Sequence, residues 1–213
     1  MRLGVDAGRA LYGRGGVASY TRELIRSLIG SSRVEEVVLF DLDRSCSRRD
    51  TFIREFGHLP AKAVVAPPDR SELEGLNLFH APGYAMPPVG APRYVFTLHD
   101  LTVLSHPHCH TLDNRVRSLA SVTDALVRGS TILAVSNATR EEAARLLELP
   151  FESIEVVPPM LNPVFTMAGD RDADAAAAAR LCVRQPYVLA VASLEPRKNF
   201  GRLLDAWSSL GGA

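Results

Sequence analysis

Two adjacent cations near the end of the sequence, Arg197 and Lys198, form the pair with the clearest chemical use. The chain has 24 Lys and Arg residues, and only Lys62 and Lys198 are lysines, so a lysine here departs from the chain's own composition. An ammonium group acts on a diphosphate oxygen as a point charge, and a neighbouring guanidinium binds with its planar fork. The pair therefore indicates a phosphate clamp, with a solvated basic turn as the alternative.

Two histidines form the second group of candidates. His80 ends the apolar run 77–81, and His99, followed by Asp100, comes directly after the run 93–98. An imidazole can donate a hydrogen bond or move a proton, and Asp100 can orient a neighbouring group. We expect both histidines at the carboxyl edge of a parallel sheet, which is the edge where ligands bind. For each of them a packed, hydrogen-bonded position in the core is the alternative.

A glycine-rich segment near the start gives two interpretations. Gly13 to Ala18 formally matches the Gly-x-Gly-x-x-Ala dinucleotide fingerprint, and Asp41 and Asp43 stand at about the distance that a ribose contact needs. In that fingerprint the strand turns directly into the first glycine, whereas residues 7–12 intervene here and predict a longer, floppier loop. We therefore favour a loop that lets another molecule approach its backbone closely, and keep a nicotinamide enzyme as an alternative.

Two further polar segments have simpler explanations. The run His106-Pro-His-Cys109-His110 looks like a metal tract in an extended loop, but no carboxylate or second cysteine lies nearby, so we expect no metal. The Ser136 hydroxyl can hold a ligand oxygen. Thr139 and Glu142 are spaced as a capping box for a helix over 140–149, and capping accounts for most of this segment.

Short β-branched apolar runs alternate with amphipathic segments, which predicts an α/β fold with a doubly wound parallel sheet. The predicted strands are Leu3–Asp6, Val37–Phe40, Lys62–Ala66, Asn77–Ala81, Arg93–Leu98, Thr131–Val135, Ile154–Val157 and the apolar first half of Tyr187–Asn199. A helix is predicted to begin near Val17 and to carry Tyr20 inward. The other predicted helices are Arg48–Phe56, Ser71–Leu76, Leu112–Val127, Arg140–Leu149, Gly169–Leu181 and Phe200–Leu210. Asn199 is the predicted cap of the last one.

Bulk properties exclude several classes of protein. The chain has 213 residues, a formal net charge of zero and a pI near 7.0, so it shows no electrostatic footprint for nucleic acid. We find no leader and no apolar run approaching the ~18 residues of a membrane span, and we expect a cytoplasmic protein. Cys46, Cys109 and Cys182 are odd in number and widely spaced, which predicts free thiols.

Four blocks in this order resemble the retaining GT-B glycosyltransferases of family 4, and most closely their bacterial mannosyltransferase-like members. The blocks begin at Gly15-Gly16-Val-Ala-Ser-Tyr20, Phe96-Thr-Leu-His99-Asp100, Ala134-Val-Ser136-Asn-Ala-Thr and Leu194-Glu195-Pro-Arg197-Lys198-Asn. The resemblance covers essentially the whole chain. It implies two Rossmann-like domains: an acceptor-binding domain over 1–165, a linker over 166–185, and the incomplete start of a nucleotide-sugar domain over 186–213.

The resemblance also implies roles for individual residues. Gly15 and Gly16 would lie near the donor phosphates or the acceptor, His99 beside the transferred sugar, and Ser136 on the wall of the cleft. Asp100 would be catalytic together with His99, and Tyr20 and His80 would be further residues that bind substrate or donor. Glu195, Arg197 and Lys198 would bind the donor diphosphate, so that no metal and no cofactor is needed. The expected reaction transfers a hexose, mannose or glucose, from a GDP- or UDP-hexose to a glycan or lipid-linked acceptor with retention.

The chain departs from the family's pattern in ways that set further expectations. It has Pro159-Met160 and Ala192 where the family usually has a glycine, and it lacks the segment with the family's pair of glutamates. We therefore expect little turnover from these 213 residues alone, with self-association through the exposed partial donor domain and peripheral contact with the inner face of the membrane. A non-catalytic acceptor-binding module that needs a partner chain is the alternative.

Overall fold

The structure is a computed structural model that describes residues 1–42, 56, 63–66, 69–87, 90–162, 165, 169–184 and 187–210, and only the backbone of Val64 and Val65. The chain divides into two compact units, Met1–Met160 and Leu161–Ala213. Of the predicted features, Asp43, Cys46, Lys62 and the helix Arg48–Phe56, apart from Phe56, lie outside the described residues.

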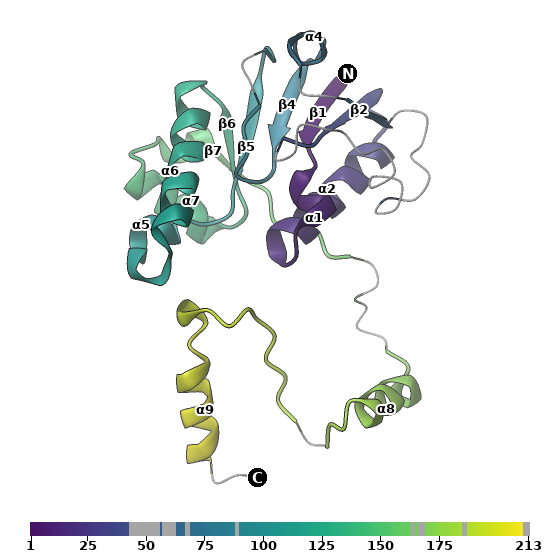
Figure 1. Cartoon of the computed structure of the whole chain (residues 1–213), viewed down its shortest axis with the longest axis vertical. Coiled ribbons are helices and arrows are strands. Elements are labelled where there is room, and N and C mark those ends of the chain that lie inside the picture. The colour runs from purple at the N-terminus through teal and green to yellow at the C-terminus, as the bar shows by residue number, and fades with distance from the viewer. Residues whose placement is uncertain are drawn as a thin grey trace. The chain divides into compact units, whose positions relative to one another are not determined.

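The first unit is built on a seven-stranded sheet in which every neighbouring pair of strands is parallel (Figure 1). The strand order is β3-β2-β1-β4-β5-β6-β7. The strands are β1 (Arg2–Asp6), β2 (Glu36–Phe40), β3 (Ala63–Val65), β4 (Leu78–Ala81), β5 (Tyr94–Leu98), β6 (Thr131–Ala134) and β7 (Ile154–Val156). This is the predicted α/β, Rossmann-like, doubly wound sheet, which is thereby confirmed.

Apolar clusters cover both faces of the sheet, which explains why its strands are continuous apolar runs. Along β2, Val37 and Leu39 belong to one cluster and Val38 and Phe40 to the other, because successive side chains of a strand point to opposite faces. Helices pack on both sides. They are α1 (Gly8–Tyr12) and α2 (Gly16–Gly30) in the first cluster, and α4 (Arg70–Glu74), α6 (Leu112–Val127) and α7 (Asn137–Leu146) in the second.

Three local predictions in this unit are wrong. Residues 8–12 form helix α1 instead of a floppy loop, since Ala10 and Leu11 are buried against the sheet. The tract 106–110 is not an extended loop, because it follows helix α5 (Thr102–Ser105) with the 3₁₀ turn η1 (Pro107–Cys109). Helix α7 starts before residue 140: Ser136 is its cap, and the Ser136 hydroxyl accepts a hydrogen bond from the Thr139 backbone N–H at 3.1 Å.

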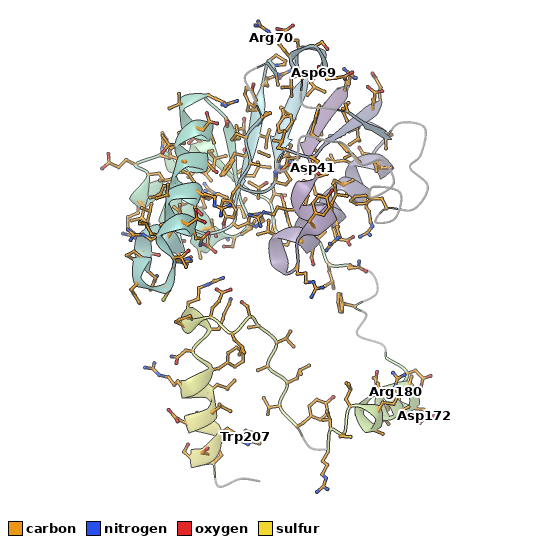
Figure 2. All side chains as sticks on the ribbon, in the orientation of Figure 1. Asp41, Asp69, Arg70, Asp172, Arg180 and Trp207 are labelled. Atoms are coloured by element: carbon orange, nitrogen blue, oxygen red, sulfur yellow. The ribbon has the colours of Figure 1, made fainter. Side chains whose placement is uncertain are left out.

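The second unit contains the helices α8 (Arg171–Arg180) and α9 (Phe200–Ser209), with the 3₁₀ turn η3 (Pro196–Lys198) before α9. Helix α8 is capped by Asp170 and has Asp172 near its first turn and Arg180 in its last, which suits the helix dipole (Figure 2). Asn199 caps α9 as predicted. Both predicted helices of this unit are thus confirmed.

The strand predicted in the first half of Tyr187–Asn199 is not formed. Val188, Leu189 and Val191 are exposed, and the described residues of this unit include no strand with which they could pair. An apolar run becomes a strand only when a neighbour supplies the hydrogen-bonded ladder. The one helical stripe predicted for α9 also lies exposed, with Trp207 40% accessible (Figure 2). The division of the chain into acceptor domain, linker and donor domain stays a prediction.

The two glycines that flank the turn between α1 and α2 differ in what surrounds them, and this difference gives a prediction. A Cβ at Gly13 would lie 2.5 Å from the Arg9 carbonyl oxygen and 3.1 Å from the Ala18 Cβ, whereas a Cβ at Gly16 would meet no atom within 4 Å. We expect Gly13→Ala to lower the free energy of unfolding by about 1–3 kcal/mol, because backbone must shift to admit the methyl group. Gly16→Ala should cause no loss. Urea denaturation of both variants measures the difference, and equal stabilities would contradict it.

Candidate functional site

The strand order places a polar site at one edge of the sheet of the first unit. The chain winds outward from β1 through β2 to β3 and then from β4 through β5 to β7, so the direction of winding reverses between β1 and β4. In open parallel sheets, ligands bind outside the carboxyl ends of the strands at this reversal, where the loops separate. Here α1 and the glycine-rich turn follow β1, and the loop that begins at Pro82 follows β4. His99 follows the neighbouring strand, β5.

His99 is held at this edge by three neighbours. Its Nε2 lies 2.8 Å from the Pro82 carbonyl oxygen. The Tyr20 ring packs against the imidazole in a T-shaped arrangement, with a centroid distance of 5.0 Å and an interplanar angle of 89°, and the Tyr84 ring lies at 6.4 Å. The ring is therefore fixed by one hydrogen bond and by aromatic packing from α2 and from the loop after β4.

These contacts determine the proton state of His99. Burial lowers the pKa of His99, and the Pro82 carbonyl and the nearby Asp100 carboxylate oppose this effect. The imidazole is therefore neutral at neutral pH. A carbonyl oxygen only accepts hydrogen bonds, so Nε2 carries the proton. Nδ1 is then an acceptor, and it has no partner among the described residues. His99 can accept a hydrogen bond from a hydroxyl group at this atom.

A buried chain of hydrogen bonds lies behind His99. Thr97, on β5, is fully buried, and its hydroxyl lies 2.8 Å from His80 Nε2 and 3.2 Å from the Tyr20 hydroxyl. Burial raises the pKa of Tyr20, so its phenol stays protonated. Tyr20 thus lies near both His80 and His99. His80 is only 5% exposed and is hydrogen-bonded, which is the packed core position that was the alternative for it.

Asp100 and Ser136 lie near this group, and both are occupied by local hydrogen bonds. One oxygen of Asp100 accepts from the Thr102 backbone N–H at 3.1 Å and from the Thr102 hydroxyl at 2.7 Å, at the start of α5. Ser136 caps α7, and its hydroxyl also lies 3.0 Å from that of Thr139. Thr139 in turn donates to the His99 carbonyl oxygen at 3.2 Å. These residues fix the backbone around His99.

The glycine-rich turn is open to solvent at two of its positions. Gly15 has φ +89°, a conformation that side chains disfavour, and no atom lies within 4 Å of a Cβ built at Gly15 or Gly16. A ligand can therefore approach this backbone. Because α1 separates β1 from Gly13, the turn lacks the direct strand-to-glycine passage of a dinucleotide fingerprint.

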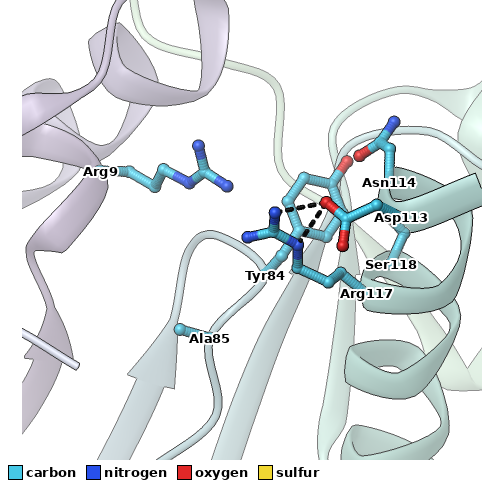
Figure 3. Close-up of a pocket in the computed structure, with 7 residues that line it drawn as sticks. All are labelled: Arg9, Tyr84, Ala85, Asp113, Asn114, Arg117 and Ser118. Carbon is cyan, nitrogen blue, oxygen red and sulfur yellow. Dashed lines mark hydrogen bonds and ion pairs between the residues drawn. The ribbon is translucent and has the colours of Figure 1, made fainter. Parts of the chain in front are cut away.

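A pocket of about 300 Å³ opens at the same edge, between α1, the loop after β4 and the first turns of α6 (Figure 3). Its lining includes Arg9, Tyr84, Asp113, Asn114, Arg117 and Ser118. Sequence analysis missed all of these residues. The one signal available was the spacing of Asp113 and Arg117 four residues apart, which allows the ion pair seen between them.

The predicted clamp residues belong to the second unit. Arg197 Nε lies 2.6 Å from Glu195 Oε2, and Ser193 donates to the other Glu195 oxygen at 2.5 Å. The hydrogen bond from Ser193, followed by the one from Arg197, lowers the pKa of Glu195, which is therefore ionised. The Lys198 charge also lowers the pKa of Glu195, but among the described residues its ammonium makes no hydrogen bond or ion pair, so its N–H groups are available to a ligand.

The histidine tract is occupied by internal contacts. His110 Nε2 lies 2.9 Å from the Thr102 hydroxyl, and Nδ1 lies 3.0 Å from the Asn114 amide nitrogen, so both ring nitrogens have partners. Over the described part of the chain, no group of three or more His, Cys, Asp or Glu side chains is placed to hold a metal ion. In the same residues, no helix combines the length and apolarity needed to cross a bilayer.

The fold and the position of the site define an α/β protein of the Rossmann-like class with its polar residues at the reversal of strand order. No family model matches the chain. The sequence is similar to O-antigen chain mannosyltransferase B of Escherichia coli, with 25% identity over 217 aligned residues. The alignment covers 92% of this chain and 56% of that protein, so the chain spans little more than half the length of this relative.

The buried His80 gives a pH-dependent prediction. Burial is the main cause that lowers its pKa from the ordinary value of 6.5 to about 4, and the nearby His99 adds to the effect. Because the folded pKa is the lower one, the unfolded chain binds the proton first, and stability falls as the pH drops from about 6.5 to about 4. The expected loss is up to about 3 kcal/mol, measured as the free energy of unfolding in denaturant across this range.

The control for this titration is His80→Gln, whose amide can still bond the Thr97 hydroxyl but does not titrate. Carboxylates titrate in the same pH range in both proteins, so only the difference between the two curves reports on His80. The variant should lose less stability on acidification. Parallel curves would show that His80 is not the group responsible.

Proposed function

We propose that this protein is a glycosyltransferase of the GT-B type and of family 4. In this proposal it transfers a hexose, with mannose favoured, from a nucleotide-sugar to a glycan or lipid-linked acceptor with retention at the anomeric carbon. The observation that carries the proposal is the similarity to a mannosyltransferase over 92% of the chain. The polar edge of the Rossmann-like sheet supports it, because this is where such folds bind ligands.

The reaction breaks the bond between the anomeric carbon and a diphosphate oxygen, and it forms a bond from that carbon to an acceptor oxygen. The electron pair of the broken bond leaves with the nucleoside diphosphate, and the proton of the acceptor hydroxyl passes to the departing diphosphate oxygen. The main demand on the protein is to stabilise the negative charge that grows on the diphosphate. The ammonium of Lys198 supplies a positive charge for this purpose, and Arg197 adds a guanidinium that Glu195 orients.

His99 acts by position in this mechanism. Its neutral ring, with the proton on Nε2, offers Nδ1 as an acceptor to a hydroxyl of the transferred sugar. Tyr20 and the Pro82 carbonyl keep the ring in one orientation, so the hydrogen bond requires no reorganisation during the reaction. The open backbone at Gly15 and Gly16 leaves room for the reacting groups to approach the same edge.

The role of His99 is tested by transfer from a labelled nucleotide-hexose, assayed with the protein expressed from its complete gene. His99→Ala should lower kcat by about 100-fold, because the sugar hydroxyl loses its fixed partner. His99→Asn, whose amide oxygen can accept a hydrogen bond, should recover part of the loss. A kcat unchanged in His99→Ala would contradict the assignment, and the absence of transfer by the wild-type protein from any nucleotide-hexose would contradict the proposed function.

The clamp is tested in the same assay by Lys198→Ala. Removal of a cation that stabilises the leaving diphosphate should lower kcat/KM by about 100-fold or more. Arg202→Ala removes a cation one turn further along, on the exposed surface of α9, and should leave kcat/KM roughly unchanged. If both variants lose activity equally, the effect arises from the general charge of the segment instead of from a clamp at Lys198.

A further inference from the structure

The pocket between α1 and α6 has no role in the mechanism above, although it opens beside the site. It lies at the reversal of strand order, where the segments that follow β1 and β4 separate. Tyr84 connects the two places, since it lines the pocket and its ring lies 6.4 Å from that of His99 (Figure 3). A molecule in the pocket would therefore reach toward the imidazole.

The pocket offers hydrogen-bond donors from two different elements, α1 and α6. Arg9, on α1, has no hydrogen-bond or ion-pair partner among the described residues, and its side chain points into the space in front of α6 (Figure 3). The stem of Arg9 packs on Gly83, where an added Cβ would come within 3.1 Å of the Arg9 Cγ. The Ser118 hydroxyl, on a buried residue of α6, also has no partner in the described chain.

The same pocket offers acceptors and an apolar surface. The Asn114 amide nitrogen is engaged by His110, so its carbonyl oxygen is the part left to a ligand. Asp113 and Arg117 form an ion pair on neighbouring turns of α6, which presents a carboxylate and a guanidinium together (Figure 3). The Tyr84 ring supplies the apolar surface.

The combination of donors, acceptors and an aromatic ring in the pocket favours a sugar over a phosphate as its ligand. A phosphate group is an anion at neutral pH whose oxygens are mostly acceptors, and the Asp113 carboxylate and the Asn114 carbonyl would repel it. A sugar hydroxyl both donates and accepts, and a pyranose ring also has an apolar face of C–H groups that matches an aromatic ring. A volume of about 300 Å³ accommodates one such ring.

We propose that this pocket binds a hexopyranose unit of the acceptor glycan, with Arg9, Asn114 and the Asp113–Arg117 pair holding its hydroxyls and Tyr84 lying against its apolar face. This inference rests on the proposed function and names the substrate class at its acceptor side. In this inference Arg9 and Tyr84 determine which acceptor binds, and His99 binds the transferred sugar. The arrangement places the acceptor next to the histidine that holds the reacting sugar.

The test is a nuclear magnetic resonance titration of the ¹⁵N-labelled 213-residue chain. The probes are methyl α-mannopyranoside, methyl α-glucopyranoside and methyl α-galactopyranoside, with inorganic phosphate as a separate arm. We expect at least one glycoside to shift the amide signals of the pocket residues in a saturable way, with Kd about 1–10 mM for so small a ligand. Arg9→Ala should weaken this binding about tenfold, since it removes a charged hydrogen-bond donor.

The matched control is Arg93→Ala, which removes an exposed arginine just before β5, at the opposite edge of the sheet. Its Kd should equal that of the wild type. Tyr84→Leu, which keeps an apolar side chain but removes the ring, should also weaken binding. Saturation by phosphate alone, no saturation by any glycoside, or equal Kd values for wild type and Arg9→Ala would each overturn the inference.

This titration can fail separately from the proposed function. If hexose transfer is observed with the complete gene product but no glycoside binds the pocket, the acceptor lies elsewhere and the glycosyltransferase proposal stands. If a glycoside binds the pocket as described but no transfer occurs from any nucleotide-hexose, the pocket is a sugar-binding site in a protein with another function.

Discussion

The parallel course of the strands, with the reversal of winding between β1 and β4, is the constraint on which the rest of the structure depends. Parallel strands bring all their carboxyl ends to one edge, and the reversal makes the segments after β1 and β4 separate there. Residues far apart in the chain, such as Arg9, Tyr84 and His99, meet as a consequence. The pairing of Val5 with His80 fixes the relative height of the two central strands, and hence of the segments that follow them.

The hydrogen bonds behind this edge explain how a polar site is kept rigid next to an apolar core. Thr97 is a polar residue within the otherwise apolar strand β5, and its hydroxyl forms hydrogen bonds with both His80 and Tyr20. A buried polar group without a partner would be costly, so these three residues depend on one another. Burial keeps the His80 ring neutral down to low pH, and the shared Thr97 hydroxyl helps to hold the Tyr20 ring against His99.

The sequence predicted the strands of the first unit well because both of their faces are buried, which requires continuous apolar runs such as 94–98. It could not predict α1, since a helix of five residues is too short for an apolar period to be recognised. The predicted cap of α7 was Thr139, whereas the observed cap is Ser136. Serine and threonine both suit the N-cap position, so residue type alone does not distinguish the two. The sequence predicted a strand in the apolar segment that begins at Tyr187 because a run of this kind does not show whether a neighbouring strand is present.

For the candidate site, sequence reasoning named the two histidines and Tyr20 but not the other groups around them. His80 and His99 stand at the ends of apolar runs, and this position can be recognised from the sequence alone. Arg9 and Asn114 are separated by more than a hundred residues, carry no motif, and meet only because the strand order brings α1 and α6 to the same edge. The role of Thr97 depends on which face of β5 it occupies, because on that face its hydroxyl meets Tyr20 of α2.

The central claim is that the carboxyl edge at the strand reversal is where sugar transfer takes place. A crystal structure of the complete gene product with a nucleoside diphosphate-hexose and an acceptor glycoside tests it most directly. The account predicts a hydroxyl of the transferred hexose within hydrogen-bond distance of His99 Nδ1, and the acceptor ring against Tyr84. Ligands bound at any other edge of the sheet, or a His99 Nδ1 that faces away from them, would contradict it.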